Sequence, residues 1–380
     1  MIAVGLMSGT SLDGIDAALL QIVPRGIGYE VRLLDFATVE FEEALRERLL
    51  ALLPPNAGSV AEVAALHREL GTCFARAART VAGEMMVDYA ASHGQTVWHD
   101  GERSVTLQIG DPFAVRDELL ATVCFDFRSA DCAAGGSGAP LVPYVDALLL
   151  GSDDETRVAV NIGGIANITV IPRASRDVRA FDSGPGNMLI DAFVRERSGG
   201  RRRFDEDGAL ALRGRVDEAA LRALLDDPYY GQAPPKSTGR ERFGAQYLRA
   251  NDRLLRDLSL EDGAATLTAL TARSLADAIR AHAPGGARVL VSGGGAHNAA
   301  VMRGLAERLE GFRVERSETM NVQGDAKEAL AFAVLGYETL RGRAANVPQA
   351  TGASRRTVLG AIAPYELRRL FEVMEAECAV

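Results

Sequence analysis

The sequence has 380 residues, enough for roughly two domains of ordinary size. Its 42 basic and 51 acidic residues give a formal net charge of −9, which argues against a basic nucleic-acid-binding protein. With 47% hydrophobic and 24% charged residues, the composition is that of a globular protein and excludes a disordered or fibrous chain.

Apolar runs in the sequence are short. None approaches the roughly 18 to 20 residues that a membrane-spanning helix needs. The first residues, MIAVGLMSGTSLDG, lack the basic and long apolar stretches of an export signal. The four cysteines are too few and too scattered for a disulfide framework or a CxxC metal site. We therefore expect a cytoplasmic protein with no membrane partner.

Lysine is nearly absent from the sequence. Only Lys236 and Lys327 are lysine, so 40 of the 42 basic residues are arginine. A Walker A loop needs a glycine directly before its lysine, but Pro235 and Ala326 precede these two. The sequence therefore excludes P-loop chemistry.

The first half of the chain alternates segments typical of strands and helices. The predicted strands are Ile2–Met7, Gly14–Val23, Glu30–Phe41, Val87–Ser92, Val105–Ile109 and Ala121–Phe125. The predicted helices are Ser59–Met86, as one long helix or a helix pair, and Pro112–Leu120. The glycine-rich stretch Ala133–Pro140 is predicted to be a loop.

The second half repeats this alternation. Its predicted strands are Arg157–Ile162, Ala166–Ile171, Val178–Asp182 and Arg288–Val291. Its predicted helices are Asn187–Arg197, Asp217–Leu225, Gln246–Leu258, Glu261–Ala283, Asn298–Leu309 and Gly324–Arg341.

Both halves open with a strand, a glycine turn and a second strand. The turns are Ser8–Gly14 in the first half and Asn161–Asn167 in the second. Such a hairpin differs from the strand, glycine turn and helix of a dinucleotide-binding unit, and neither turn contains GxGxxG. The pattern predicts a duplicated, two-lobed α/β fold with a ligand between the lobes.

The first turn, within Met7–Asp16, combines two glycines, three hydroxyls and two carboxylates. Glycines let the backbone approach an anion closely, and successive N–H groups form a nest for it. The hydroxyls of Ser8, Thr10 and Ser11 can donate to phosphate oxygens, and Asp13 could hold a hydrated Mg²⁺. An ordinary hairpin with Asp-Gly at its tip would explain the same pattern.

A second glycine-rich turn lies within Val289–Asn298. The strand ends in Gly293, Gly294 and Gly295 before a helix, which lets a flat base or sugar lie against bare backbone. The alternative is a tight strand-to-helix connection with Asn298 as the N-cap.

Two carboxylates are candidate catalytic groups. Asp182 is predicted at the carboxyl end of a strand, where a side chain points into the ligand crevice of an α/β lobe and can act as a general base. Alternatively, it caps the following turn by accepting from the N–H of Gly184 or Gly186. Glu328 lies in the first turn of a helix, where the helix dipole alone favours glutamate.

Three polar segments suit a small acidic ligand, namely Ser92–Thr96, Leu107–Pro112 and Asp126–Arg128. Arg128 can grip a carboxylate through its planar guanidinium. Each segment alone is more often a loop with its polar groups satisfied locally. The histidines show no metal-ligand spacing and there is no GxSxG motif, which excludes zinc hydrolases and serine esterases of the usual kinds.

Together these segments resemble the anhydro-N-acetylmuramic acid kinases, a family of the actin, hexokinase and heat-shock-chaperone ATPase superfamily. The resemblance runs over Met7–Ala17, Ser92–Thr96, Leu107–Pro112, Asp126–Arg128, Ala133–Pro143, Asn161–Thr169, Phe181–Asp191, Lys236–Glu241, Ser292–Asn298, Glu328–Ala333 and Asn346–Ala353. It implies an actin-like ATPase fold with mixed sheets and a nucleotide cleft between two lobes. We expect an N-terminal lobe over 1–150, to which 345–380 return, and a C-terminal lobe over 151–344.

The resemblance also implies ATP, Mg²⁺ and particular site residues. The implied nucleotide contacts are Gly9, Thr10, Ser11, Leu12, Asp13, Gly14, Ile15, Asp16, Asn161, Gly163, Gly164, Asn167, Gly293, Gly294 and Gly295, with Asp13 as the metal ligand. The implied sugar contacts are Ser92, His93, Gln95, Gln108, Asp111 and Arg128. Asp182 matches the general base of the family, and Glu328 matches a second carboxylate near the attacking water.

The implied reaction couples two events on 1,6-anhydro-N-acetylmuramic acid. Water opens the anhydro bridge at the anomeric carbon, and the released 6-oxygen takes the γ-phosphoryl of ATP, giving N-acetylmuramic acid 6-phosphate and ADP in murein recycling. The alternatives are a kinase for another amino sugar and a non-enzymatic ATP-binding module of the same superfamily. We expect a small-molecule sugar as partner and no nucleic acid, and the resemblance implies a homodimer.

Overall fold

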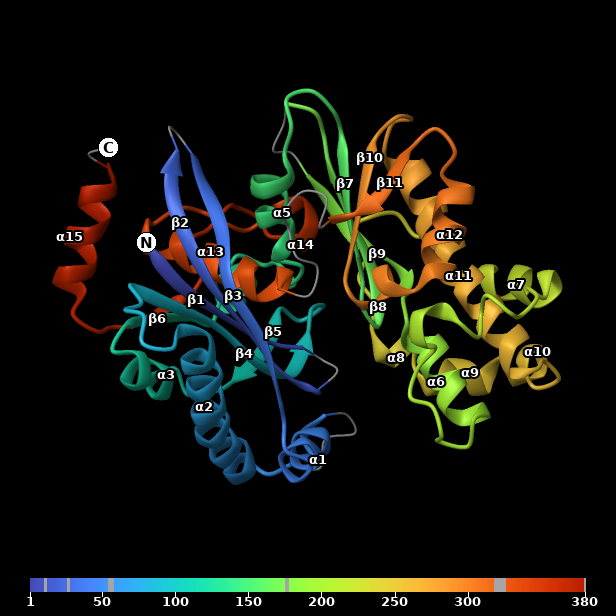
Figure 1. Ribbon diagram of the computed structural model, residues 1–380, viewed down its shortest axis with the longest axis horizontal. Helices are drawn as coiled ribbons and strands as arrows, with labels where there is room; N and C mark the ends of the chain where they lie inside the picture. The colour runs from blue at the N-terminus through green and yellow to red at the C-terminus, as the bar shows by residue number, and fades with distance from the viewer. Residues whose placement is uncertain (10–11, 26–27, 54–57, 175–177, 318–325, 379–380) are drawn as a thin grey trace. The chain divides into compact units, whose positions relative to one another are not determined.

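The computed structural model describes residues 1–9, 12–25, 28–53, 58–174, 178–317 and 326–378 (Figure 1). Contacts divide the chain into two units: unit 1 is Met1–Val145 with Ala326–Val380, and unit 2 is Asp146–Asp325. The expected lobes differ from this division by residues 146–150 and 326–344. The larger difference arises because α13 (Lys327–Leu340) packs against strands of unit 1. The expected cleft between lobes stays a prediction.

Unit 1 is built on a mixed sheet with the strand order β12-β6-β4-β1-β2-β3, and β5 pairs with β4. The strands are β1 Ile2–Ser8, β2 Gly14–Arg25, β3 Gly28–Glu40, β4 Tyr89–Asp100, β5 Val105–Ile109, β6 Thr122–Phe125 and β12 Ala361–Ala363. The first three strands form an antiparallel meander, whereas β4 runs parallel to β1 and β6 parallel to β4. The carboxyl ends of β1 and β4 therefore lie at the same edge of the sheet.

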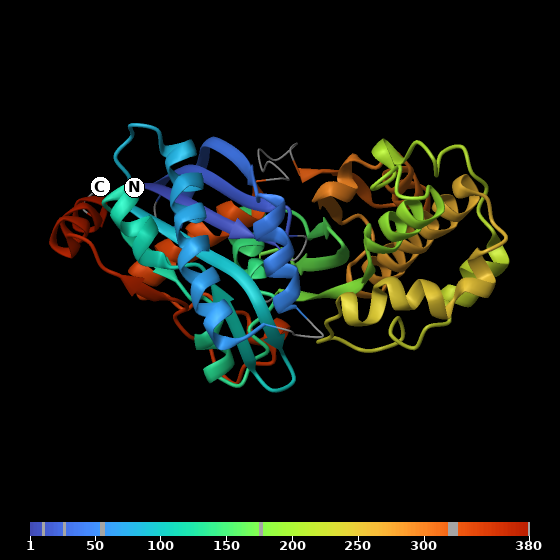
Figure 2. The same ribbon diagram turned by 90° about the horizontal axis from the view of Figure 1, so that it is seen from below.

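Helices cover both faces of this sheet (Figures 1 and 2). The helices of unit 1 are α1 Glu43–Leu52, α2 Val60–Ala82, α3 Pro112–Leu119, α4 Ser129–Ala133, α13, α14 Pro348–Thr351 and α15 Leu367–Cys378, and α5 Val142–Leu150 contains the boundary between the two units. On one face, Val4 and Leu6 of β1 share a core with Leu66 and Phe74 of α2. On the other face α13 approaches closely, because a Cβ at Gly5 would lie only 1.9 Å from the Ala329 carbonyl oxygen.

Unit 2 repeats the topology of unit 1. Its sheet has the order β11-β10-β7-β8-β9. The strands are β7 Arg157–Ile162, β8 Ile165–Ile171, β9 Arg179–Pro185, β10 Arg288–Ser292 and β11 Arg313–Arg316. Here too an antiparallel meander comes first, β7 to β9, and β10 and β11 are then added parallel to β7. This shared order is the signature of duplication that the two glycine hairpins predict.

The helices of unit 2 form two cores. They are α6 Met188–Arg197, α7 Glu218–Leu225, α8 Arg240–Phe243, α9 Ala245–Ala250, α10 Asp252–Leu255, α11 Leu260–His282 and α12 Ala299–Arg308, with short 3₁₀ turns at Glu206–Gly208 and Gly294–His297. The second half of α11 and α12 pack on the sheet. The first half of α11 packs with α6, α7 and α9 in a separate core.

Most predicted elements are confirmed, including both hairpins, and the differences have physical reasons. The helix predicted over 246–258 is divided at Asn251 into α9 and α10. The strand predicted over 87–92 continues to Asp100 because β5 pairs with its second half. Strands β11 and β12 and helices α1, α4, α5, α8, α14 and α15 are additional to the prediction. Within the described residues, no helix has the length and apolar character to cross a membrane.

Candidate functional site

The hairpin between β1 and β2 is tied to strand β4 by two polar side chains. The Ser8 hydroxyl lies 2.8 Å from the Gly14 carbonyl oxygen and 2.6 Å from Oε1 of Gln95. The Gln95 amide donates to the carbonyl of Gly9 at 3.3 Å. Ser8 and Gln95 are both 1% exposed, so these hydrogen bonds are shielded from water. The predicted phosphate turn and one predicted sugar contact therefore belong to one hydrogen-bonded cluster.

The tip of this hairpin holds the predicted metal ligand. Asp13 is exposed, while Asp16 accepts a hydrogen bond from Thr38 of β3 at 2.6 Å. Leu12 and Ile15 are buried, so their main chain, not their side chains, is what a ligand would meet. Thr10 and Ser11, which sequence reasoning placed among the nucleotide contacts, lie outside the described residues.

A second cluster in unit 1 joins His93, Arg128 and Glu328. Nε of Arg128 donates to Nε2 of His93 at 2.9 Å, and Nη1 donates to the Gly138 carbonyl at 2.8 Å. The His93 ring lies 4.6 Å from the ring of Phe332 on α13, measured between centroids. Ser92, which precedes His93, is 3% exposed on β4.

Electrostatics in this cluster favours neutral carboxyl and imidazole groups. Burial lowers the pKa of His93 well below its usual range, and the charge of Arg128 lowers it further. Burial also lowers the pKa of Arg128 to about 10, which leaves the guanidinium charged at neutral pH. Burial and the negative charge of Asp16 raise the pKa of Glu328, against the opposing charges of Arg128 and Lys327. Glu328 thus combines a raised pKa with a place near charged groups, which is typical of a functional carboxyl.

Two residues predicted to contact the sugar make hydrogen bonds or ion pairs within the fold. Nε2 of Gln108 donates to the hydroxyls of Thr96 and Thr106 at 3.1 and 2.6 Å. Asp111 caps α3 by accepting from the N–H of Phe113 at 2.9 Å, and it pairs with Arg68 at 2.8 Å. The sugar-binding roles of Gln108 and Asp111 stay predictions, whereas their roles in the fold are observed.

In unit 2 three glycine-rich segments meet. The β7–β8 hairpin accepts hydrogen bonds at the carbonyls of Gly163 and Gly164 from the turn after β9, at distances of 2.8 to 3.1 Å. A Cβ at Gly293, which has a φ of +79°, would lie 2.6 Å from Oδ1 of Asn161, and a Cβ at Gly295 would lie 2.2 Å from Cγ2 of Ile162. The glycines are therefore required for these segments to touch, whereas binding of a base or sugar against Gly293–Gly295 stays a prediction.

Asparagine residues lie beside these glycine-rich segments. Asn167 pairs with Asp182 in the register of β8 and β9, next to a bulge. Gly294 is open, since a Cβ there would meet only the Asn187 amide, at 3.7 Å. Asn298 caps α12 through the N–H groups of Ala300 and Val301, as the alternative interpretation of that segment expects.

Asp182 lies inside β9, because the strand continues to Pro185 and does not end at position 182 as expected. Its Oδ2 accepts from the hydroxyl of Ser237 at 3.0 Å and from the N–H of Thr238 at 2.9 Å. The N–H of Gly186, which the capping alternative assigns to Asp182, instead donates to Gly164. Ser237 and Thr238 are not among the site residues expected from the sequence, although they lie in the segment Lys236–Glu241 that carries part of the family resemblance and follow the rare Lys236.

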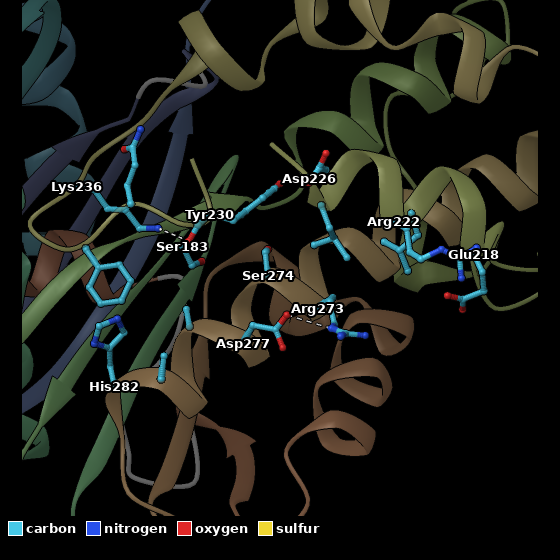
Figure 3. A pocket seen from close by; sticks show the side chains of 16 residues that line it. Ser183, Glu218, Arg222, Asp226, Tyr230, Lys236, Arg273, Ser274, Asp277 and His282 are labelled. Atoms are coloured by element: carbon cyan, nitrogen blue, oxygen red, sulfur yellow. Dashed lines mark hydrogen bonds and ion pairs between the residues drawn. The ribbon is translucent and has the colours of Figure 1, made fainter. Parts of the chain in front are cut away.

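A pocket of about 410 Å³ opens in unit 2 (Figure 3). Its lining includes Phe181 and Ser183 of β9, Lys236, and Ser274 and His282 of α11. Neighbouring residues of a strand point to opposite faces, so this pocket lies on the face of β9 away from the Asp182 side chain. None of the predicted site residues lines it.

The candidate metal site does not resemble a protein-only metal centre. Among the described residues, no group of three or more histidine, cysteine, aspartate or glutamate side chains is arranged to hold a metal ion. Mg²⁺ commonly binds through one or two carboxylates, waters and the phosphates of its nucleotide. The exposed carboxylate of Asp13 fits that mode of binding.

Comparison with solved structures gives remote likenesses. The activator of 2-hydroxyisocaproyl-CoA dehydratase from Clostridium difficile, solved with bound ADPNP, is 11% identical with a TM-score of 0.43 and covers 89% of this chain and 95% of that one. A ROK hexokinase from Thermus thermophilus is 18% identical with a TM-score of 0.34 and covers 89% and 99%.

Comparison of sequences is far more specific. The family model described as anhydro-N-acetylmuramic acid kinase matches residues 1–365. Relatives of that name include one from Streptomyces coelicolor, 43% identical over 96% of this chain and 94% of the relative, and one from Xanthomonas axonopodis pv. citri, 44% identical over 95% and 97%. A third, from Caldanaerobacter subterraneus subsp. tengcongensis, is 41% identical over 95% and 96%. The chain therefore belongs to the anhydro-N-acetylmuramic acid kinase family.

Proposed function

We propose that this protein is an ATP-dependent kinase that opens the anhydro ring of 1,6-anhydro-N-acetylmuramic acid and phosphorylates its 6-oxygen. The observation that carries the proposal is the family match over residues 1–365, which includes every candidate site residue of both units. The geometry supports it, because Ser8 and Gln95 in unit 1 and Asp182 in unit 2 are each held by hydrogen bonds beside glycine-rich turns.

The ring-opening step needs a base. The oxygen of a water molecule bonds to the anomeric carbon while the bond from that carbon to the 6-oxygen breaks. Water is a poor nucleophile, so a positioned carboxylate that takes its proton contributes about 10²- to 10⁴-fold. We assign this role to Asp182, whose carboxylate is held by Ser237 and Thr238. Glu328, with its raised pKa, is assigned to the same reaction as a second carboxyl.

The phosphoryl-transfer step needs alignment and charge neutralisation more than covalent chemistry. We propose that the turns at Gly9–Asp16 and Asn161–Asn167 bind the phosphates of ATP through backbone N–H groups and that Gly293–Gly295 lie against the adenosine. Asp13 would hold Mg²⁺, which supplies positive charge at the phosphates. Arg128, charged at neutral pH, supplies a local grip for the acidic sugar in a protein of net charge −9.

The test is a transfer assay with Mg-ATP and the anhydro sugar in ¹⁸O-labelled water. A 6-phosphate product that carries the label at the anomeric oxygen is expected. Asp182→Asn should lower turnover by about 10²-fold or more while ATP affinity stays within about threefold, a shift under 1 kcal/mol. Turnover only on unbridged amino sugars would favour the alternative substrate. ADP formation that no sugar stimulates would favour a non-enzymatic module and contradict the proposal.

We further propose that the protein works in the cytoplasm, in murein recycling, as a homodimer without nucleic-acid or membrane partners. The support for the cytoplasm is a sequence without long apolar runs, and the support for the dimer is the family resemblance. Sedimentation equilibrium at micromolar concentration tests the dimer, and a mass equal to one chain of 40.4 kDa would contradict it.

A further inference from the structure

The segment Lys236–Thr238 lies beside β9 and forms hydrogen bonds with both the side chain and the main chain of Asp182. Oδ2 of Asp182 accepts from the Ser237 hydroxyl at 3.0 Å and from the Thr238 N–H at 2.9 Å. The N–H of Asp182 donates to the carbonyl of Lys236 at 3.2 Å. The carboxylate and the backbone of one residue are thus held by three consecutive residues.

This segment is itself anchored by aromatic residues. The Tyr229 hydroxyl donates to the carbonyl of Asp182 at 2.8 Å. The Lys236 ammonium donates to the carbonyls of Tyr229 and Tyr230 at 3.0 and 3.3 Å. It also lies 4.6 Å from the ring centroid of Tyr229 and 5.7 Å from that of Phe181. Tyr229 is 2% exposed, so these contacts are shielded from water.

We propose that Ser237 and Thr238 are positioning residues for Asp182, and that Lys236 locks them in place from the opposite face of β9. The inference rests on the proposed function, in which Asp182 takes the proton of the attacking water. Two donors that meet on one carboxylate oxygen fix the rotation of the carboxylate and stabilise its ionised form. Both effects matter to a base, which must be ionised and aligned before water attacks.

The identity of Lys236 supports this role. The ammonium is compact and donates to two carbonyls close together in sequence, and it does so beside two aromatic rings. A guanidinium is longer and planar, with a fixed fork of donors, and cannot reproduce that contact. The chain uses lysine here although 40 of its 42 basic residues are arginine. Lys236→Arg is therefore expected to disturb the segment despite keeping the charge.

The experiment compares Ser237→Ala with Ser183→Ala in the ring-opening assay from pH 5 to pH 9. Each variant removes one serine hydroxyl near Asp182, but that of Ser183 bonds to the Ala166 carbonyl at 3.0 Å on the other face of β9. Ser237→Ala should lower kcat about tenfold, the loss expected for one hydrogen bond to a charged group. Its acidic limb should move to higher pH, because the ionised carboxylate has lost a donor, and the KM for ATP should not change.

Two conservative substitutions of Ser237 complete the test. Ser237→Thr keeps the hydroxyl and should restore the pH profile, and Ser237→Cys, a weak donor of similar size, serves if the alanine variant does not fold. Equal losses in Ser237→Ala and Ser183→Ala with an unmoved acidic limb would overturn the proposal, since the hydroxyl would then be merely structural. If Asp182→Asn keeps the wild-type turnover rate, the assignment of Asp182 as the general base is wrong. If that variant is inactive and Ser237→Ala has the wild-type profile, only the positioning role is wrong.

Discussion

Nε of Arg128 donates to Nε2 of His93 at 2.9 Å, and this contact places the proton of the imidazole on Nδ1. A guanidinium can only donate, so Nε2 must accept, and Nδ1 then donates to the Gly94 carbonyl at 2.8 Å. A second proton on this ring would face the Arg128 charge without an acceptor. The folded protein therefore holds His93 neutral.

The first prediction is a dependence of stability on acid through His93. Its pKa is lowered on folding, so below about pH 6.5 the unfolded chain binds a proton that the folded chain does not. Stability should fall with decreasing pH there, by up to about 1.4 kcal/mol per pH unit from this group. His93→Gln keeps an acceptor for Arg128 but does not titrate. Urea unfolding at pH 7.5, 6.0 and 5.0 should give a shallower loss for the variant, and parallel losses would contradict the assignment.

The second prediction concerns Glu328, whose pKa is raised in the folded protein. The unfolded carboxyl ionises near about 4.3, so stability due to this group declines as pH rises from there through the folded pKa. Glu328→Gln should therefore be more stable than wild type at pH 8 while turnover falls by about 10²-fold. Glu43→Gln, a first-turn glutamate of α1 that is 71% exposed, is the matched control for the helix dipole. Equal turnover in the two variants would remove Glu328 from the reaction.

The third prediction tests the contact between β1 and α13. Gly5→Ala places a Cβ 1.9 Å from the Ala329 carbonyl oxygen, so strand and helix must separate. We expect a loss of about 3 kcal/mol in the free energy of unfolding, together with lower turnover, because Glu328 adjoins Ala329. Gly285→Ala is the control, since a Cβ there meets nothing within 4 Å. The control should be neutral or slightly more stable, because alanine lowers the entropy of the unfolded chain. A loss of the same size at both positions would contradict the importance of the contact.

The parts of the fold that depend on local pattern are well predicted by the sequence. Asp-Gly and Gly-Gly turns between alternating apolar residues indicate the two hairpins, and Glu328 lies in the first turn of its helix as expected. Helix α5 is apolar along most of its length and carries no 3.6-residue period, so the same pattern gives no sign of a helix. The charged helix α1 forms because Leu45 and Leu49 join a core that assembles from distant segments.

Site residues can be predicted from the sequence only where a reactive side chain or a glycine turn forms a recognisable local motif. Asp182 and the glycine turns are visible as motifs, whereas the residues that hold Asp182 are 55 and 56 positions further along the chain. A serine and a threonine in a polar segment carry no periodic signal, so their role follows from tertiary structure alone. The contacts that Gln108 and Asp111 make within the fold cannot be predicted from the sequence for the same reason.

The fourth prediction concerns the carboxylate of Asp131, which is fully buried. It accepts from Asn346 at 2.7 Å, from Thr351 at 2.9 Å and from the N–H of Gly138 at 2.9 Å. Asp131→Ala leaves three buried donors without this acceptor and should cost about 4 kcal/mol in the free energy of unfolding. The exposed Asp153→Ala should change it by less than about 0.5 kcal/mol. Chemical denaturation of both variants decides, and similar midpoints would contradict the importance of the cluster.

The discontinuity of unit 1 has a consequence for synthesis on the ribosome. Unit 2 is one continuous stretch, whereas the sheet of unit 1 receives α13 and β12 from residues that follow it. Domains fold as their residues emerge from the ribosome. All residues of unit 2 are therefore synthesised before α13, the helix that packs against the face of β1 at Gly5. During that interval the nascent chain exposes an apolar sheet surface, the kind of surface to which chaperones bind.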